Sequence, residues 1–151
     1  MTWNPQLLDV LERIRKNAVF MSEKHRARYL EYKATSKYFD MPVILLSVFS
    51  SSFASLGSVP PHKSGLVTTC ISMTITVLTS IKLYLNLAST ITEEVSLSKD
   101  YYILAVSIFK TLALSEADRF VDPKQFLSES YGQYIKLFEQ STLLKTNIKK
   151  R

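Results

Sequence analysis

The sequence is organised around Met41–Leu83, which reads MPVILLSVFSSSFASLGSVPPHKSGLVTTCISMTITVLTSIKL. No Asp, Glu, Lys or Arg lies between Asp40 and Lys63, and none lies between Lys63 and Lys82. Each uncharged run is close to the ~20 residues that a helix needs to cross the ~30 Å hydrocarbon core of a bilayer. Residues typical of turns separate the two runs: Gly57, Pro60, Pro61 and Gly65. We therefore expect two transmembrane helices, 41–59 and 66–86, joined by a loop at 60–65.

A soluble protein with two buried core helices is the alternative, because both runs are rich in serine or threonine. A helix on the surface of a soluble bundle normally carries charge every three or four residues. These runs carry none, and we favour the membrane interpretation. A length of 151 residues predicts a single domain, 1–151, and the single cysteine, Cys70, excludes an intrachain disulfide.

The first forty residues predict a cytoplasmic amphipathic helix. Asn4 and Pro5 are typical of a helix start, and an apolar stripe runs from Leu7 through Leu11, Ile14 and Ala18. Basic and aromatic residues alternate near its end, a pattern that also occurs in nucleic-acid interfaces. Because a span follows at once, we expect no nucleic-acid partner. We interpret these residues, with two after the second span, as interfacial anchors: Arg26, Arg28, Tyr29, Tyr32, Lys37, Tyr38, Lys82 and Tyr84.

Hydroxyl side chains recur at helical spacing within both spans. They are Ser47, Ser51 and Ser55 in the first span and Thr69, Ser72, Thr76 and Thr79 in the second. Two interpretations stay open. Small polar residues allow close packing and interhelical hydrogen bonds within the hairpin, or they line a polar path when several copies assemble. The absence of ionisable residues inside either run argues against a proton relay or a charge-pair transporter site.

The second span is expected to continue without a break into a cytoplasmic helix at 87–114. Its apolar stripe includes Val95, Tyr102 and Phe109, and we expect this stripe to pack against the first helix as an antiparallel bundle in water. Asp122 and Pro123, with Gln125 as a capping partner, predict the start of a last helix at 122–146.

The expected fold is thus an all-α membrane protein, in which a two-helix transmembrane hairpin is continuous with an antiparallel cytoplasmic helical bundle. Eight Lys and Arg residues precede the first span and ten lie from Lys82 onward, whereas the connecting loop has only Lys63. The positive-inside rule therefore places both termini in the cytoplasm.

Residues for catalysis or metal binding lack supporting context. His25 and His62 fall on opposite sides of the expected membrane, and no glycine-rich phosphate loop is present. Glu93 and Glu94 are adjacent on a helix and point in different directions, so we interpret both as solvated surface. We expect no enzyme activity, no metal and no cofactor.

The chain from about Glu23 to Leu114 resembles the SLATT family, two-transmembrane effector domains that associate with SMODS and SLOG partners. The resemblance is carried by HRARYLEY at 25–32, MPVILLS at 41–47, FASLG at 53–57 and IKLYLN at 81–86, followed by a long helix with Tyr101 and Tyr102. It implies a membrane effector that forms pores or perturbs membranes when a partner triggers it. We expect no fused sensor domain in this chain, so the trigger would be a separate partner, such as a sensor, or oligomerisation. Relatives in large DNA viruses imply a structural role in a membrane-containing particle.

Two functions follow from these observations. In the first, a two-pass membrane protein forms a homo-oligomer, contacts lipid, and opens or perturbs a membrane. In the second, the hairpin is a non-conducting anchor, and the soluble helices form a scaffold that binds a partner such as a coat protein of a virion.

Overall fold

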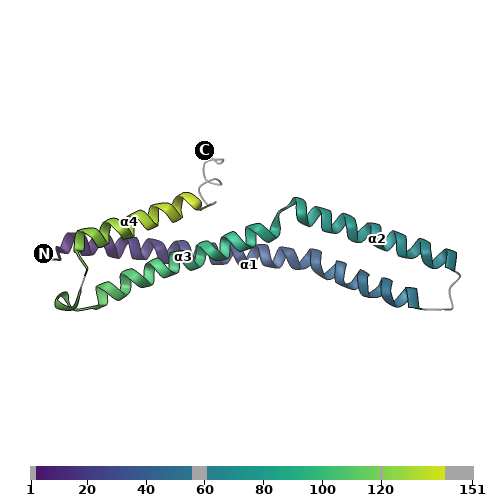
Figure 1. Cartoon of the computed structure of the whole chain (residues 1–151), viewed down its shortest axis with the longest axis horizontal. Coiled ribbons are helices and arrows are strands. Elements are labelled where there is room, and N and C mark those ends of the chain that lie inside the picture. The colour runs from purple at the N-terminus through teal and green to yellow at the C-terminus, as the bar shows by residue number, and fades with distance from the viewer. Residues whose placement is uncertain (1–2, 56–60, 120, 142–151) are drawn as a thin grey trace. The chain divides into compact units, whose positions relative to one another are not determined.

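The computed structural model describes residues 3–55, 61–119 and 121–141, without the side chains of 54, 55, 61, 62 and 117. The described residues form α1 (Pro5–Ser55), α2 (Pro61–Tyr84), α3 (Leu87–Ala113), a short 3-10 helix η1 (Glu116–Asp118) and α4 (Pro123–Gln140) (Figure 1). No strand occurs within these described ranges. The prediction of an all-α fold is confirmed.

Helix α1 combines the predicted amphipathic helix and the predicted first span in one element. It begins at Pro5, where the Asn4 side-chain oxygen accepts a hydrogen bond from the Gln6 N–H at 3.1 Å. It then continues through Pro42, where we expected a new helix to begin. A proline inside a helix removes one hydrogen bond and crowds the preceding turn, at a cost of about 3 kcal/mol. The helix continues on both sides of this site, so the structure tolerates that cost.

The helix is interrupted between the predicted second span and the next segment, and the prediction of an unbroken helix here is wrong. Helix α2 ends at Tyr84, and α3 begins at Leu87. Asn86 has a backbone φ of 49°, a left-handed conformation that asparagine adopts more readily than most residues. The Asn86 carbonyl then accepts the Thr90 N–H at 3.1 Å, which starts the hydrogen-bond ladder of α3.

The chain divides into two compact units. One comprises residues 1–28 and 93–151, which we call the bundle unit, and the other comprises residues 29–92, which we call the hairpin unit. The bundle unit holds the first part of α1, most of α3, and all of α4. The hairpin unit holds the remainder of α1 with α2.

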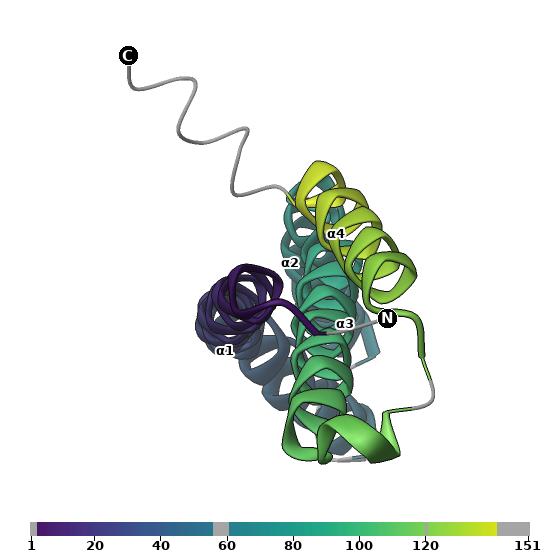
Figure 2. The ribbon, with the colours of Figure 1, turned by 90° about the vertical axis from the view of Figure 1, so that its left-hand side faces the viewer.

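The core of the bundle unit forms where α1 and α3 run antiparallel. Ser22 on α1 donates to the Ser98 carbonyl on α3 at 2.8 Å, and His25 contacts Glu94. Helix α4 covers one side of this pair and adds partly buried apolar residues (Figure 2). The core residues are Trp3, Leu11, Ile14, Ala18, Tyr101, Leu104, Ala105 and Ile108. The predicted antiparallel pairing is therefore confirmed.

The buried face of α3 differs from the predicted one. Tyr101 is fully buried, whereas its neighbour Tyr102 is 60% exposed and Phe109 is 58% exposed. The sequence offers two apolar stripes on this helix, displaced by about one residue. The predicted stripe with Tyr102 and Phe109 is buried only in part, at Leu87 and Ala105, whereas the core uses the stripe with Tyr101, Leu104 and Ile108.

Helix α4 begins as predicted and ends earlier. The Asp122 carboxylate accepts the Gln125 N–H at 3.1 Å, and Pro123 occupies the first turn. The Gln125 side chain donates to Glu129 at 2.8 Å, so it does not complete the expected capping pair. The helix ends at Gln140, and the rest of the predicted range to 146 lies, after Ser141, outside the described residues.

Candidate membrane-spanning hairpin

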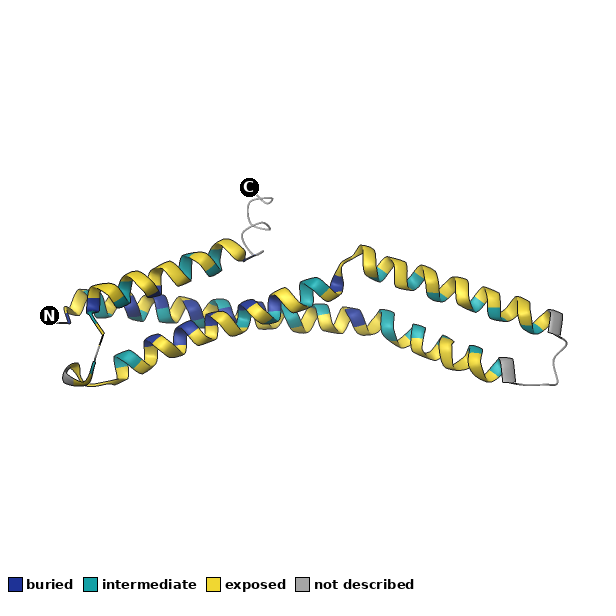
Figure 3. Ribbon diagram, viewed as in Figure 1, coloured by how far each residue is buried: buried dark blue, intermediate teal, exposed yellow. Residues whose placement is uncertain are grey.

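Half-buried side chains mark where the two helices of the hairpin unit face each other. On α2 the half-buried residues recur at helical spacing and include Ile71, Ile75 and Leu78, while Leu46 and Phe53 are half-buried on α1 (Figure 3). Because all other faces of these two segments are exposed, this stripe is where the helices meet. The contact is therefore largely apolar, although serine and threonine side chains are also half-buried along it.

The predicted hydroxyl stripes lie on exposed faces. Ser47, Ser51, Thr69, Ser72, Thr76 and Thr79 are all exposed, and the side chain of Ser55 is outside the described part. Ser47 donates to the Val43 carbonyl at 2.7 Å, and Thr69 and Thr76 donate to the carbonyls of Gly65 and Ser72 at 2.8 Å. Bonds of this kind satisfy a hydroxyl within its own helix. The two stripes are not brought together across the hairpin.

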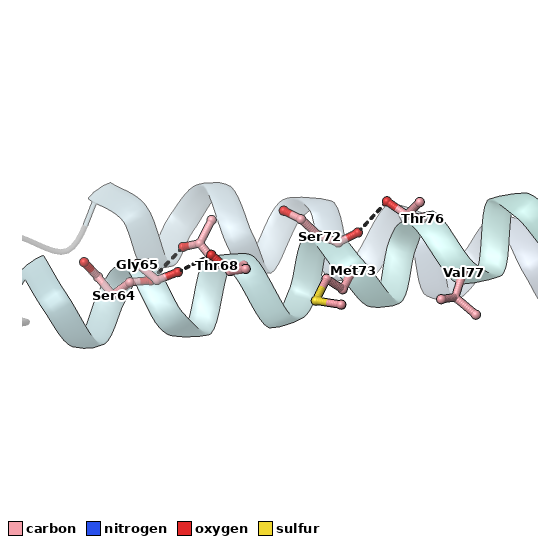
Figure 4. A pocket seen from close by; sticks show the side chains of 8 residues that line it. Ser64, Gly65, Thr68, Ser72, Met73, Thr76 and Val77 are labelled. Carbon is pink, nitrogen blue, oxygen red and sulfur yellow. Dashed lines mark hydrogen bonds between the residues drawn. The ribbon is translucent and has the colours of Figure 1, made fainter.

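Three of the predicted hydroxyl residues share a shallow hollow along α2. Thr69, Ser72 and Thr76 line it together with Ser64, Gly65, Thr68, Met73 and Val77 (Figure 4). Small side chains at this spacing lower the helix surface between larger neighbours, which lets another helix approach closely. The lone thiol, Cys70, is exposed on the same helix.

Large apolar side chains cover the exposed faces of the hairpin unit. Ten of those within 41–83 are between 42% and 74% exposed: Met41, Ile44, Leu45, Val48, Phe49, Leu66, Met73, Val77, Ile81 and Leu83. Among the described residues, one helical stretch, Lys63–Ala113, contains a window long and apolar enough to cross a membrane, and none of that window is buried. The uncharged end of α1 does not reach this measure within its described residues.

A charged pair and two exposed tyrosines mark one end of the hairpin. Lys82 Nζ on α2 contacts Asp40 Oδ1 on α1 at 2.5 Å, and Ser36 donates to the other carboxylate oxygen at 3.0 Å. The hydrogen bond from Lys82 lowers the pKa of Asp40. Tyr38 and Tyr84, at the same end, are 80% and 90% exposed. Sequence reasoning identified three of these four residues and missed Asp40.

The other predicted anchors have varied surroundings. Lys37 is exposed, Tyr32 is half-buried, and Tyr29 accepts a hydrogen bond from Lys33 at 3.0 Å. Arg26 is exposed in the bundle unit. Arg28 contacts the buried Glu94 carboxylate at 3.2 Å, so a structural ion pair already engages this guanidinium.

A buried polar cluster in the bundle unit was missed by the sequence analysis. His25 Nδ1 lies 2.5 Å from Glu94 Oε2, and His25 Nε2 lies 2.9 Å from Ser141 Oγ. His25, Glu94 and Ser141 are 0%, 1% and 2% exposed. The interpretation of Glu94 as solvated surface is therefore wrong, and so is the statement that His25 has no supporting context. A buried face of α3 that includes Glu94 can be recognised only once Tyr101 and Leu97 are known to be core residues.

Aromatic rings extend this cluster from α3 to α4. The His25 ring stacks on Tyr101 with centroids 5.6 Å apart, and Tyr101 meets the edge of Tyr134 at 6.0 Å. The Tyr101 hydroxyl is buried and has no hydrogen-bond partner in the described structure. Burial, with a smaller contribution from Tyr134, raises the pKa of Tyr101 to about 12.

The atoms of Ser141, His25 and Glu94 follow the order of a hydrolase triad, but burial prevents that chemistry in this conformation. A substrate carbonyl would have to reach the Ser141 hydroxyl, which is enclosed. The cluster instead links the end of α4 to α1 and α3. Within the described residues, no group of three or more His, Cys, Asp or Glu side chains could hold a metal ion.

Comparison with known proteins gives one viral relative. The chain is 28% identical over 144 residues to the uncharacterized protein VP11 of Micromonas pusilla reovirus (isolate Netherlands/2005), and the match covers 94% of this chain and 74% of VP11. No family model matches the chain. No solved structure matches it.

Proposed function

We propose that the protein is a two-pass membrane protein that self-associates and opens or perturbs a membrane. One observation carries the proposal. The hairpin unit presents uncharged faces with large exposed apolar side chains, while many of its serines and threonines, Ser47 and Thr76 among them, bond to carbonyls of their own helices. Contiguous apolar surface of this kind is rare on soluble monomers. In lipid, every polar backbone and side-chain group needs a partner inside the protein, and these hydroxyls have one.

The end of the hairpin at Asp40 and Lys82 supplies the expected boundary with water. Exposed tyrosines and paired charges suit the headgroup region, where aromatic rings and Lys or Arg side chains meet both solvents. Under this proposal Tyr38, Tyr84 and the Asp40–Lys82 pair lie in that region on the cytoplasmic side. Both termini are then cytoplasmic, and the residues between α1 and α2 face the opposite side.

The hydroxyl face of α2 is the proposed contact between copies and the proposed lining of a conducting path. It is exposed in the single chain, and a hollow with small side chains runs along it. Each hydroxyl that bonds within its helix keeps oxygen lone pairs that can face water. The resemblance to SLATT effectors supports the same function.

Thiol labelling tests the membrane topology. A cysteine that replaces Lys63 should react with a membrane-impermeant maleimide only from the side opposite to a cysteine that replaces Lys37, in a Cys70→Ser background. The two lysines are both exposed and therefore form a matched pair. Labelling of both thiols from the same side of sealed vesicles would exclude the hairpin.

Conductance of the full chain in a planar bilayer tests the effector function. We expect discrete channels that are lost when Thr69, Ser72, Thr76 and Thr79 are all replaced by leucine. Thr74→Leu is the control, because Thr74 is also exposed and also bonds within α2, to Cys70 O at 2.9 Å, but lies on the opposite face. Channels that survive the fourfold replacement would exclude this lining.

A non-conducting scaffold is the second candidate function, and the similarity to a reovirus protein favours it. In this case the hairpin anchors the chain, and the bundle unit binds another component of a particle. A silent bilayer with inserted, folded protein would support the scaffold over the effector.

A further inference from the structure

Pro42 leaves one backbone carbonyl of α1 without its helical donor. In an α-helix the N–H of each residue bonds to the carbonyl four residues earlier, so the Tyr38 carbonyl would accept its bond from residue 42. Pro42 lies inside α1, and proline has no N–H. Because a backbone carbonyl is a strong acceptor, this one needs a donor from another source.

The hydroxyl side chains of the preceding turn do not supply that donor. Thr35 donates to the Glu31 carbonyl at 3.0 Å, and Ser36 donates to the Asp40 carboxylate at 3.0 Å. Each bond uses the single proton that a hydroxyl can donate. The Tyr38 carbonyl is therefore left to a donor from the surroundings.

A shallow hollow lies on α1 at the same place, within the hairpin unit. The residues that line it are Ala34, Lys37, Tyr38, Met41 and Pro42. Both residues of the missing hydrogen bond are thus part of its lining. Tyr38 and Met41 are 80% and 57% exposed, so the hollow is open to whatever surrounds α1. We call it the Pro42 hollow.

Lys37 brings a positive charge to the Pro42 hollow. Two other lysines near this end of the hairpin are engaged: Lys33 donates to the Tyr29 hydroxyl at 3.0 Å, and Lys82 contacts Asp40. Lys37 is exposed and forms no ion pair with any residue that the structure describes. Its ammonium group can therefore pair with an anion from outside the chain.

The order of groups along the Pro42 hollow matches the order of groups in a phospholipid. Lys37 precedes Asp40, the last charged residue before the uncharged run. Met41 and Pro42 begin that run. A cation and a free acceptor thus lie toward the headgroup end, and an apolar wall lies toward the hydrocarbon end.

We propose that the Pro42 hollow binds a phospholipid whose headgroup carries a primary ammonium group, as phosphatidylethanolamine does. The Lys37 ammonium group pairs with the lipid phosphate, and the lipid ammonium group donates to the Tyr38 carbonyl. The glycerol and the upper part of an acyl chain lie against Met41 and Pro42. One cation and one acceptor on the protein match one phosphate and one ammonium group on the lipid, and hydrogen bonds with an ionised partner are the stronger kind.

The headgroup chemistry predicts which phospholipids fit. Phosphatidylcholine has the same phosphate, but its quaternary nitrogen has no hydrogen to donate. Phosphatidylglycerol has hydroxyl donors without a positive charge, so its bond to a carbonyl is weaker. Lys37 should therefore contribute to the retention of all three lipids, whereas the Tyr38 carbonyl should provide the preference for ethanolamine.

The lipid site rests on the membrane position of the hairpin in the proposed function, but it needs neither self-association nor a pore. Native mass spectrometry of the full chain in mild detergent tests it, with equal amounts of the three lipids and identical acyl chains. We expect several-fold greater retention of phosphatidylethanolamine. Equal retention of phosphatidylcholine would overturn the role of the carbonyl. Stronger retention of phosphatidylcholine, through a cation–π contact with Tyr38, or of phosphatidylglycerol would also overturn the proposal.

Replacement of the proline separates lipid binding from folding. Pro42→Ala supplies the missing N–H to the Tyr38 carbonyl, so this variant should unfold at a higher temperature. The same variant should lose the preference for phosphatidylethanolamine over phosphatidylcholine. A purely structural role of Pro42 would leave the ratio of the two lipids unchanged, and that result would overturn the proposal.

Replacement of the lysine tests the phosphate contact. Lys37→Gln should lower the retention of phosphatidylethanolamine and phosphatidylcholine alike, by several-fold. Lys33→Gln is the matched control, because Lys33 is also exposed, lies one turn earlier on α1, and is already bonded to Tyr29. Equal losses in the two variants would overturn the assignment of Lys37.

A soluble headgroup distinguishes a lipid from a free phosphate ester. Phosphoethanolamine lacks the acyl chains and should not displace the lipid at equal concentration; displacement would assign the Pro42 hollow to a soluble ligand and overturn the lipid site. The two proposals also fail separately. A hairpin with the expected thiol labelling but without a headgroup preference retains the membrane topology and loses this site. A headgroup preference in a protein that does not conduct retains the site and removes the pore.

Discussion

The bundle unit, formed by parts of α1 and α3 with α4, and the hairpin unit, formed by the rest of α1 with α2, are both helical, yet they place polar and apolar groups in opposite ways. The bundle unit encloses Tyr101, Ile108 and even a charged group, Glu94, and exposes most of its lysines and glutamates. The hairpin unit exposes residues such as Leu45 and Met73, and many of its hydroxyls bond to the backbone of their own helix. The comparison teaches that the way in which a helix satisfies its polar groups indicates the surroundings it suits, water or lipid. It does so more clearly than the periodicity of the apolar residues.

The largest expected effect comes from breaking the interior of the bundle unit. Glu94→Leu leaves His25 and Arg28 without their carboxylate, and loss of one partner of a buried ion pair costs about 3–5 kcal/mol. Glu93→Leu is the control, because Glu93 is adjacent and exposed, and its cost should stay within ~0.5 kcal/mol. Unfolding in mild detergent, followed by circular dichroism, measures both. Similar stability of the two variants would mean that the cluster is not structural.

Placing a lysine at an exposed apolar position in each unit tests the difference between the two units most directly. Met73 and Ile103 are 66% and 64% exposed, so accessibility alone predicts the same tolerance for lysine. We expect Met73→Lys to oppose membrane insertion by about 3 kcal/mol and Ile103→Lys to have little effect on insertion. Glycosylation mapping of the inserted fraction measures the difference. Equal insertion of both variants would argue that the hairpin is not in lipid.

High pH should reveal the enclosed tyrosine of the bundle unit. Because the folded state raises the pKa of Tyr101 from 10.0 to about 12, it favours the neutral phenol. The contribution of this group to stability is complete below pH 10 and is lost as the pH rises through 12, a total of roughly 3 kcal/mol. Tyr101→Phe should remove this loss, and Tyr102→Phe should not. Ultraviolet titration at high pH, together with unfolding curves, checks both variants. Identical pH profiles of stability for the unmodified protein and for Tyr101→Phe would contradict the enclosed hydroxyl.

The smallest effect concerns the start of α4, an element confined to the bundle unit. Asp122→Ala removes the side chain that accepts the Gln125 N–H, and loss of such a cap costs about 1 kcal/mol. Gln125→Ala removes only a surface hydrogen bond to Glu129 and should cost less than ~0.5 kcal/mol. Thermal unfolding ranks the two. A larger loss of stability for Gln125→Ala than for Asp122→Ala would support the reciprocal capping pair that the sequence predicted.

Local signals in the sequence predicted the helix starts at Pro5 and Pro123, because proline and a capping side chain act within a few residues. They also predicted the pairing of α1 with α3, since the stripe from Leu11 to Ala18 has one clear register. No local signal indicated which of the two neighbours, Tyr101 or Tyr102, is buried. Two apolar stripes overlap on α3, and only the position of α1 and α4 decides which one is buried.

The polar cluster could not be predicted for a related reason. His25, Glu94 and Ser141 are separated by 69 and 47 positions in the sequence, and each alone looks like a surface residue. Their burial follows from the register of three helices. The hydroxyls of the hairpin were recognised as a stripe, but whether Thr69 and Thr76 face α1 or the exterior depended on Ile71, Ile75 and Leu78, which are bulky enough to form the contact.

The single exposed thiol of Cys70 offers a way to measure the proposed membrane depth of α2 in the unmodified protein. A thiol reacts with maleimides as the thiolate, which needs water, so under the proposed topology its labelling rate would report how deeply that turn of α2 lies in the bilayer. A lipid-soluble reagent and a water-soluble reagent of the same chemistry would bracket the immersion without any substitution. Assembly, a trigger or a change of bilayer thickness would then be read as a change in one rate constant.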